Sequence, residues 1–417
     1  MDRFTGIIGI VLLLGIAYLM SENRKAISGR LVLVGLMLQL LLAVLILKVQ
    51  WITRFFSILG SGMSKLEQFA TKGAEFVFGG LMVGHAANQS IPYGSPQTFV
   101  FAFSVTATII LVCVLVALCY QLGVLQRVVL VLAKSMNRLM RVSGSEALSN
   151  VASAFVGQVE AQVMIRPYLK GMTRSEMLSS MTGSMACIAG GILIVYVNMG
   201  AKAEYLLAAS IMAAPGALVI SKILIPETEV SETSGKVSLQ VHKPYANSID
   251  AISHGAAEGM KIALNVIAML IGFIALISLV NYGLGWLGKI GNWYPQLSLD
   301  TLFGALFYPI AWCMGANGSD TLPVAMLMGQ KLSINEFVAF DTLTHKLTHP
   351  LSEKANAIAS FAICGFANFA SVGMQIGGIG TLVPEKRSQL AKLGLKALLG
   401  GTLASYLSAA IAGILMG

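Results

Sequence analysis

Long apolar stretches are the feature that most limits what this chain can fold into. Residues 31–48 and 261–284 are almost unbroken apolar runs, close to the roughly 20 residues that a helix needs to cross about 30 Å of hydrocarbon. Of all 417 residues, 56% are hydrophobic and 11% are charged, whereas about 25% are charged in an ordinary soluble domain. So few charges cannot cover a water-facing surface. The chain is therefore predicted to be an all-α polytopic membrane protein.

Eight apolar runs are predicted to be transmembrane helices. They are residues 5–21, 31–48, 98–124, 176–199, 203–223, 261–284, 356–380 and 391–415. The first run follows Arg3 as in a signal peptide, but no small-residue cleavage site comes after it, so we interpret it as a retained helix. An even number of crossings puts both termini on the same side of the membrane.

Basic residues predict which side that is. The net charge of +9 arises largely from clusters that flank the spans. These are Arg24, Lys25 and Arg30 after the first span, and Arg127, Lys134, Arg138 and Arg141 after the third. Because the positive-inside rule places such clusters in the cytoplasm, we expect both termini outside, in the periplasm of a bacterial inner membrane. This distribution does not predict a nucleic-acid partner.

The five cysteines lie in apolar surroundings, and none forms a CxxC pair. Such cysteines usually pack as small hydrophobic residues. Neither a metal nor a disulfide is predicted, and no cofactor is expected.

Similar segments recur in the same order in two parts of the chain. Each part contains a span, an interfacial segment, a polar-bearing segment and two further spans. The interfacial segments are a helix at 126–148 and residues 301–330, which prolines and glycines interrupt, and the polar-bearing segments are 149–172 and 331–353. An odd number of crossings in each part would invert one copy relative to the other, as in many transporters.

The repeat divides the chain into four predicted regions. They are the N-terminal helices with a weak interfacial segment at 51–74 (1–97), the first repeat (98–223), a cytoplasmic loop (224–257) and the second repeat (258–417).

One span in each repeat carries chain-breaking sequence at its middle. "CIAGGIL" (187–193) contains a glycine pair, and "CGFANFAS" (364–371) combines glycine with asparagine and serine. Glycines also allow close packing of helices in membranes, so packing alone explains either segment singly. Because both repeats are interrupted at corresponding places, we favour two unwound helices that expose backbone groups to a ligand.

Carboxylates in the polar-bearing segments are stronger candidates for function. Glu160 follows Gln158 and precedes Gln162, and Glu336 follows Asn335. A charged side chain at the centre of a bilayer costs about 2.5–3.5 kcal/mol on insertion scales, so such residues usually have a role. The alternative is that both glutamates face headgroup water. We predict that Gln158, Glu160 and Gln162 together face a ligand in a hydrated cavity.

A second group has helical spacing. Asp341, His345 and His349 stand four residues apart, so on one helical face they would be able to bind a metal or relay protons. The alternative is that they are polar surface residues, because no fourth ligand is evident, and their role stays open.

Several long motifs together resemble the concentrative nucleoside transporters of the bacterial type. They are "FVGQVEAQ", "MTRSEMLSSM…IAGG", "AEYLLAASIMAAPGALVISKILIPETE", "ALNVIAMLIGFIALISLVN", "NEFVAF" and "CGFANFAS". The resemblance covers nearly the whole chain. It implies eight transmembrane helices, two re-entrant hairpins, two unwound helices, a homotrimer, and import of nucleosides with an ion gradient by alternating access.

The resemblance also assigns residues to a substrate site. It implies that Gly157, Gln158 and Glu160 form the tip of the first hairpin and face the base, where Val159 and Ile192 depart from the usual residues. For the ribose it implies the following side chains: Glu336, Phe366, Asn368 and Ser371. Because Val159 cannot form a hydrogen bond, the base preference of relatives does not transfer to this chain.

The driving ion is predicted from the positions where this chain differs from sodium-coupled members of the family. Sodium-coupled members use an Asn and a Ser where this chain has Ser153 and Cys187, together with nearby carbonyls, here those of Val156 and Ile188. A thiol is a poor ligand for a hard cation. We therefore favour a proton over sodium, carried by Glu160 or by Glu336.

Two other functions stay open at this stage. One is a carrier of another small polar solute on a related hairpin fold, and the other is a membrane-embedded hydrolase. A hydrolase would need an activated nucleophile, and no such pattern is present.

Overall fold

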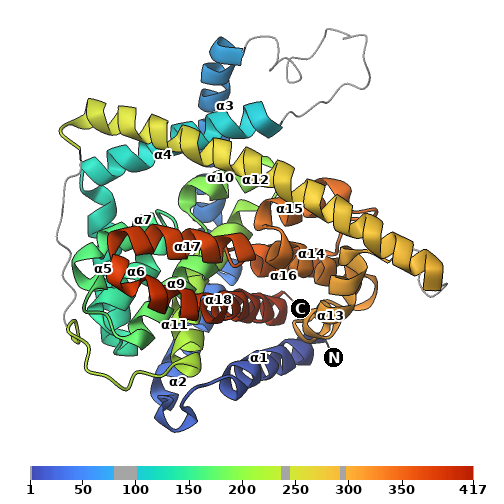
Figure 1. The fold of residues 1–417 in the computed structure, drawn as a ribbon, viewed down its shortest axis with the longest axis horizontal. Helices are drawn as coiled ribbons and strands as arrows, with labels where there is room; N and C mark the ends of the chain where they lie inside the picture. The colour runs from blue at the N-terminus through green and yellow to red at the C-terminus, as the bar shows by residue number, and fades with distance from the viewer. Residues whose placement is uncertain (1, 79–100, 236–244, 292–296, 417) are drawn as a thin grey trace.

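The computed structural model describes residues 2–78, 101–235, 245–291 and 297–416. Within these ranges every regular element is a helix, which confirms the predicted all-α class (Figure 1). Parts of all four predicted regions fall outside the described residues: residues 1 and 79–97, residues 98–100 at the start of the first repeat, residues 236–244 of the loop, and residues 292–296 and 417 of the second repeat.

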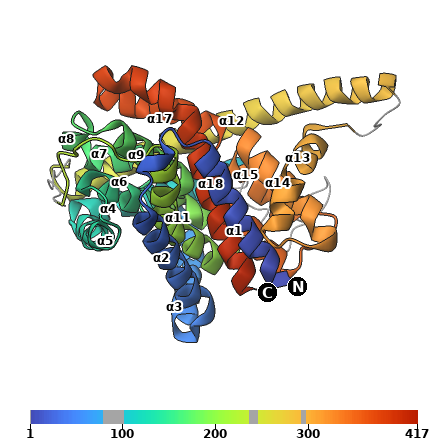
Figure 2. The same cartoon turned by 90° about the horizontal axis from the view of Figure 1, so that it is seen from below.

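The N-terminal helices pack against the centre of the molecule. Helix α1 (Asp2–Leu19) lies along α18 (Arg387–Leu415), and α2 (Gly29–Lys48) lies along α11 (Ala203–Leu224). The segment predicted at 51–74 is part of one long helix, α3 (Gln50–Phe78). The two ends of the described chain lie next to each other (Figure 2).

Gln39 joins three of these helices. This α2 side chain is fully buried, and its Nε2 donates to the Met212 carbonyl at 3.0 Å and to Ser408 Oγ at 3.2 Å. Small residues allow the close approach, because a Cβ on Gly216 of α11 would overlap the Gln39 amide.

Helices α4 (Phe101–Gln121) and α5 (Val124–Met140) meet at a bend of 74°. Gly123 lies at the bend with a φ of +73°, a conformation that glycine adopts without strain. One face of α5 is buried at Val129, Ala133 and Met136, while Val131 and Leu139 on other faces are exposed. This amphipathic pattern fits the interfacial helix predicted at 126–148.

The first polar-bearing segment consists of α6 (Gly144–Ser153), a turn, α7 (Glu160–Met164) and α8 (Arg166–Leu169). We call residues 144–169 hairpin 1. It begins earlier than the predicted residue 149, because Ser143 and Glu146 form a capping box that starts α6. The following span is broken, as predicted, between α9 (Arg174–Ala186) and α10 (Gly190–Asn198).

The second repeat starts with α12 (Ser248–Gly291), which is 44 residues long. The loop predicted at 224–257 is therefore shorter than expected. It ends at Asn247, whose Oδ1 accepts hydrogen bonds from the backbone amides of Ile249 and Asp250 and so starts the helix.

The segment 301–330, predicted to be interfacial and interrupted by glycines and prolines, is broken into two helices, and its position at the membrane interface stays a prediction. The chain forms two helices, α13 (Leu299–Cys313) and α14 (Thr321–Ser333), which pack against each other. Gly315 and Gly318, which lie between the two helices, have φ values of +101° and +62°. A residue with a β-carbon would be strained in this backbone conformation.

Helix α14 is therefore the first arm of a second hairpin. The second arm is α15 (Glu336–Asp341), which continues into a π-helical turn (Thr342–Lys346). We call residues 321–346 hairpin 2, which starts ten residues before the predicted 331 and ends before the predicted 353. The next span is broken between α16 (Glu353–Ile363) and α17 (Phe369–Leu382).

Four helical segments among the described residues are long and apolar enough to cross a membrane, or five if the bent pair of α4 and α5 counts as one span. They are α2, α11, α12 and Pro384–Leu415. The other predicted spans are short or broken helices, so the count of eight stays a prediction, as do the re-entrant path of the hairpins and the inverted orientation of the repeats. Short 3₁₀ turns lie at Arg24–Ala26, Gly318–Asp320 and Pro384–Lys386.

Candidate functional site

The two broken spans meet at their breaks. The amide of Phe366, in the second break, donates to the Cys187 carbonyl, in the first break, at 3.3 Å. Gly365 has a φ of +126°, and a Cβ there would overlap the Ala186 carbonyl. The tip of hairpin 1 joins them, because the Gly190 amide donates to the Phe155 carbonyl at 3.2 Å. Three interruptions of helical structure therefore converge.

Glu336 of hairpin 2 lies in this region and is held on both carboxylate oxygens. It is 3% exposed. Its Oε1 accepts from the Tyr196 hydroxyl at 3.2 Å, and its Oε2 accepts from Asn368 Nδ2 at 2.9 Å. Tyr196 comes from the first broken span and Asn368 from the second. Each hydrogen bond to a charged group such as this carboxylate contributes about 1.5–3 kcal/mol to stability.

Asn368 and Ser371 continue this contact toward hairpin 1. Asn368 caps α17, because its Oδ1 accepts from the Ser371 amide at 2.8 Å. Gln158 Nε2 lies 3.5 Å from Ser371 Oγ and 3.6 Å from Met374 Sδ. The Oε1 atom of Gln158 is buried and accepts no hydrogen bond from any described residue. A buried acceptor without a partner needs an explanation, and a ligand provides one.

Glu160 differs from Glu336 in its surroundings. Its side chain is exposed, and no described side chain donates a hydrogen bond to it. The carboxylate folds back over Gly157, where a Cβ would lie 2.6 Å from Oε2. Gly157 has a φ of +116°, so the tip requires glycine both for its backbone and for the space beside Glu160.

The apolar residues predicted for the site lie around this region. Val159 packs on α17, since a Cβ on Gly378 would lie 2.8 Å from its methyl groups. Ile192 is 9% exposed in α10, and Phe366 is partly buried between the two breaks.

Gln162 was predicted to face a ligand, and this is wrong. It is fully buried, and its Nε2 donates to Ser149 Oγ at 3.1 Å and to Ser184 Oγ at 2.8 Å. Its Oε1 accepts from Ser180 Oγ at 2.7 Å. These bonds fix both arms of hairpin 1 to α9, so the amide of Gln162 is satisfied within the protein.

The residues at the positions where relatives bind sodium also make contacts within the protein. Ser153 Oγ donates to the Ser149 carbonyl at 2.8 Å and lies 2.9 Å from Ser184 Oγ. The Ile188 carbonyl accepts from Ser210 Oγ at 3.3 Å. The buried Cys187 Sγ lies 3.9 Å from the Ser210 carbonyl oxygen, and the amide of Val156 donates to the Ala152 carbonyl.

Two buried residues near Glu336 were not predicted. The ring of Tyr196 stacks on Phe340 at 4.4 Å and meets Phe337 edge-on at 4.9 Å. Lys331 of α14 is fully buried, and its Nζ has no hydrogen-bond partner among the described residues. A tyrosine hydroxyl and a lysine inside apolar segments both need partners, and that requirement is the signal that would have identified them.

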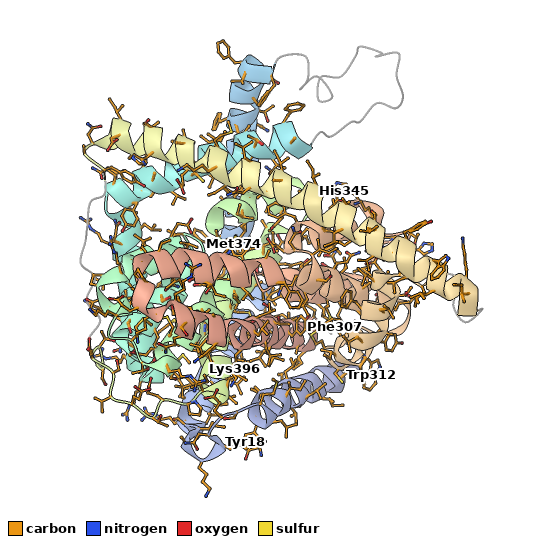
Figure 3. The ribbon with its side chains drawn as sticks, viewed as in Figure 1. Tyr18, Phe307, Trp312, His345, Met374 and Lys396 are labelled. Carbon is orange, nitrogen blue, oxygen red and sulfur yellow. The ribbon has the colours of Figure 1, made fainter. Side chains whose placement is uncertain are left out.

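Asp341, His345 and His349 do not lie together on one helical face. The Asp341 carboxylate pairs with His345 Nδ1 at 3.2 Å and with Lys346 Nζ at 2.6 Å. His345, labelled in Figure 3, and Lys346 are exposed. The helical turn ends at Lys346, so His349 does not share their face. Within the described ranges, no three His, Cys, Asp or Glu residues lie close enough to hold a metal.

Family models match almost all of the chain. Residues 8–81 and 205–413 match the N-terminal and C-terminal models of Na+ dependent nucleoside transporters, and residues 102–203 match a gate model described as nucleoside recognition. This chain belongs to the concentrative nucleoside transporter family.

Individual relatives agree with this assignment. The chain is 40% identical to an uncharacterized transporter of Haemophilus influenzae, covering 100% of this chain and 99% of that protein. It is 37% identical to the nucleoside permease NupC of Helicobacter pylori, covering 99% and 97%. It also resembles the structure of CNTnw in an inward-facing substrate-bound state, with a TM-score of 0.92, 36% identity, and 100% and 98% coverage. The protein is therefore a multi-pass transporter of a bacterial inner membrane.

Proposed function

We propose that this protein imports nucleosides by alternating access, as a homotrimer, with a proton rather than sodium as the driving ion and with both termini in the periplasm. One observation carries the proposal. A continuous line of polar side chains runs from Glu336 through Asn368 and Ser371 to Gln158, and it joins both hairpins through the second broken span. Tyr196 of the first broken span donates to Glu336 at one end of this line. A substrate on this line contacts both repeats at once.

The chemistry of the line suits a nucleoside. Glu336 accepts from vicinal hydroxyls, and Asn368 both donates and accepts, so this end suits the ribose. Gln158 presents one unpaired acceptor and one long, weak donor contact, which suits the edge of a base. Gly157 gives the tip its shape, while Val159, Ile192 and Phe366 provide apolar surface for the ring.

Competition by a deoxynucleoside tests the ribose assignment. A site built to pair a hydroxyl rejects an analogue that lacks it, because losing one hydrogen bond to a charged group costs about 1.5–3 kcal/mol, a factor of roughly ten or more. Uridine should therefore compete for radiolabelled uridine uptake at least about tenfold better than 3′-deoxyuridine. Equal competition by the two compounds removes Glu336 and Asn368 from the ribose site.

The proton assignment rests on candidate sodium ligands that already make contacts within the protein or are poor ligands for sodium. The Ser153 hydroxyl is used between α6 and α9, and Cys187 offers sulfur to a cation that prefers oxygen. Only backbone carbonyls such as those of Val156 and Ile188 are left, and Ser210 already donates to the second of these. Glu160, exposed at the hairpin tip, is the proposed proton carrier, with Glu336 as the alternative.

Restoring oxygen ligands tests this assignment. Ser153→Asn combined with Cys187→Ser supplies an amide and a hydroxyl at the positions where sodium-coupled relatives have them. Uptake by this variant should increase with external sodium, while uptake by the wild type should not. A matched control is Cys119→Ser, which changes an exposed cysteine outside the site. Sodium-dependent uptake by the wild type contradicts the proton assignment.

Two other functions make different predictions. A membrane-embedded hydrolase would release base from ribose, which chromatography of the transported solute detects. A carrier of another small polar solute would be saturated by that solute and not by uridine.

A further inference from the structure

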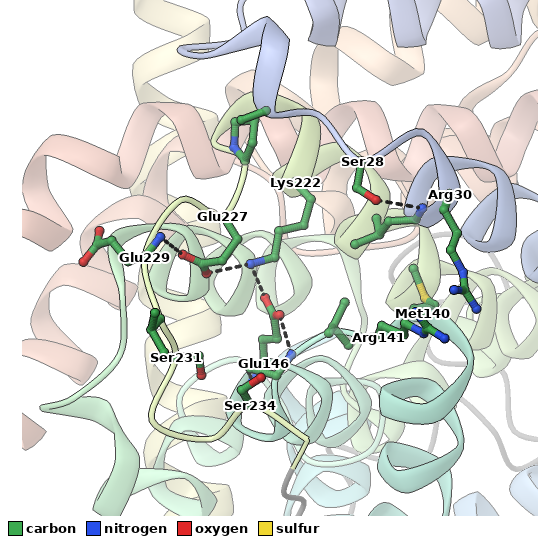
Figure 4. A pocket seen from close by; sticks show the side chains of 16 residues that line it. Ser28, Arg30, Met140, Arg141, Glu146, Lys222, Glu227, Glu229, Ser231 and Ser234 are labelled. Atoms are coloured by element: carbon green, nitrogen blue, oxygen red, sulfur yellow. Dashed lines mark hydrogen bonds and ion pairs between the residues drawn. The ribbon is translucent and has the colours of Figure 1, made fainter.

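A cavity of about 480 Å³ lies apart from the substrate line, where the N-terminus of α2, the C-termini of α5 and α11, and residues 226–234 meet. Its lining contains several charged side chains (Figure 4). They are Arg30, Arg141, Glu146, Lys222, Glu227 and Glu229. These formal charges sum to zero, so their arrangement decides what the cavity binds.

Lys222 pairs with two carboxylates at the centre of the cavity. Its Nζ lies 2.8 Å from Glu146 Oε2 and 3.2 Å from Glu227 Oε2, and its side chain is 7% exposed. Glu146 is also buried, and it caps α6. One lysine and two carboxylates carry a net charge of −1, so this group does not attract an anion, and an anionic ligand must be held elsewhere in the cavity.

Two arginines make the opposite side positive. Figure 4 shows Arg30 and Arg141 beside Met140, on the side of the cavity away from Glu229. Both arginine side chains are exposed, and within the described part of the chain neither makes an ion pair. The backbone fixes Arg141 at the rim: its amide donates to the Asn137 carbonyl, and Asn137 Nδ2 donates to the Val142 carbonyl at 2.6 Å.

The positive side continues into apolar surface. Leu33 and Met37 follow Arg30 at three and seven residues on α2, hence on the same helical face, and they are 57% and 59% exposed. On α5, which packs against α2, Leu139 precedes Arg141 and is 49% exposed. In a multi-pass membrane protein such side chains face lipid. A ligand held by the arginines therefore has an apolar path beside it.

We propose that this cavity binds the phosphodiester headgroup of an anionic phospholipid, with Arg30 and Arg141 on the phosphate and the acyl chains along Leu33, Met37 and Leu139. Arginine matches phosphate through paired N–H donors. Basic pockets between helices on the cytoplasmic side are typical sites for such lipids, and the basic clusters of this chain predict that side. The apolar path favours a lipid over a soluble anion.

Native mass spectrometry of the purified full-length transporter tests this proposal. Phosphatidylglycerol should remain bound more than phosphatidylethanolamine with the same acyl chains. The variant Arg30→Gln with Arg141→Gly should reduce the apparent affinity for phosphatidylglycerol about tenfold or more. Glycine at 141 accepts the positive φ of 55°, so the variant removes the guanidinium without straining the backbone.

The matched control is Arg127→Gln with Lys134→Gln, which removes two exposed charges of α5 outside the cavity. This control should bind phosphatidylglycerol like the wild type. Equal loss in both double variants, or no loss in the cavity variant, overturns the proposal. Glycerol phosphate binding as tightly as the lipid also overturns it, because the site would then belong to a soluble anion.

Discussion

The two hairpins carry equivalent carboxylates in unlike surroundings. Glu336 of hairpin 2 is buried, and its two oxygens accept from Tyr196 and Asn368. Glu160 of hairpin 1 is exposed, and no described side chain donates to it. Side chains from two other elements hold the Glu336 carboxylate, whereas only backbone amides of its own turn bond the Glu160 carboxylate.

This difference separates two tasks. A carboxylate held by two donors cannot move far, and it presents a rigid acceptor at low entropic cost. A carboxylate at a glycine-containing tip reorients easily and meets water, so it can gain and lose a proton. We therefore expect Glu336 to recognise substrate and Glu160 to couple transport to the ion.

The largest expected effect follows from Glu336→Gln. This change removes the charge that Tyr196 and Asn368 stabilise, and two weakened bonds of about 1.5–3 kcal/mol each predict a loss of uridine uptake of about a hundredfold or more. Uptake is measured per molecule of protein in the membrane. Wild-type rates in this variant would show that the buried carboxylate does not hold substrate.

The variant Glu160→Gln should break transport differently. Without a proton carrier it should not accumulate uridine against a gradient, yet it should still exchange internal for external uridine. Proteoliposomes loaded with unlabelled uridine measure the exchange. If both carboxylate variants lose exchange equally, the two residues share one task.

Tyr196→Phe sharpens the comparison at the fixed carboxylate. The stack on Phe340 remains, while one hydrogen bond to Glu336 is lost, so the apparent affinity for uridine should fall about tenfold. Tyr406→Phe is the matched control, because Tyr406 is also buried and its hydroxyl has no hydrogen-bond partner among the described residues. The control should transport like the wild type. Equal effects of the two changes would mean that Tyr196 acts only through packing.

The smallest effect is expected at a third carboxylate, Glu22, outside the site. Arg174 donates to it at 2.6 and 2.8 Å, and Lys396 donates as well. Burial opposes the charge, but the two hydrogen-bonded cations hold the pKa of Glu22 below its ordinary value. Glu22→Gln should leave uptake unchanged and lower the free energy of unfolding by about 0.2–1 kcal/mol, since the pair is partly exposed.

The effect of Glu22 should depend on pH in one direction. Because the folded-state pKa is lowered, the stabilisation is present above the unfolded-state pKa and is lost as the pH falls through the folded-state value. Thermal unfolding of the wild type and Glu22→Gln should therefore differ at neutral pH and converge in acid. If the difference in unfolding temperature between the two proteins grows in acid, the stabilising role of the Glu22 ion pairs is contradicted.

The sequence predicted the breaks in the spans better than the limits of the hairpins. Glycine, asparagine and serine at 364–371 interrupt an apolar pattern, and that local signal is enough. Where α13 ends and α14 begins depends instead on Gly315 and Gly318 turning the chain back, and composition does not show the direction of a turn. The sequence therefore showed that the 301–330 segment is broken, but it did not show that the part after the break belongs to hairpin 2.

Single residues show the same limit. Glu160 and Gln162 looked alike in the sequence, two polar groups in an apolar stretch. Only tertiary contacts separate them, because three serines from α6 and α9 satisfy Gln162 while Glu160 stays exposed. Tyr196 was missed for a related reason, since its role depends on Glu336, 140 residues away.

Uridine accumulation in proteoliposomes under a single imposed gradient tests the central claim most directly. With sodium absent and the external pH lowered from about 7.5 to about 5.5, internal uridine should rise above the external concentration, and a protonophore should abolish the rise, because transport of a proton on a carboxylate drives the solute. A sodium gradient at equal pH should give no accumulation. Accumulation that requires the sodium gradient and ignores the proton gradient would contradict the account.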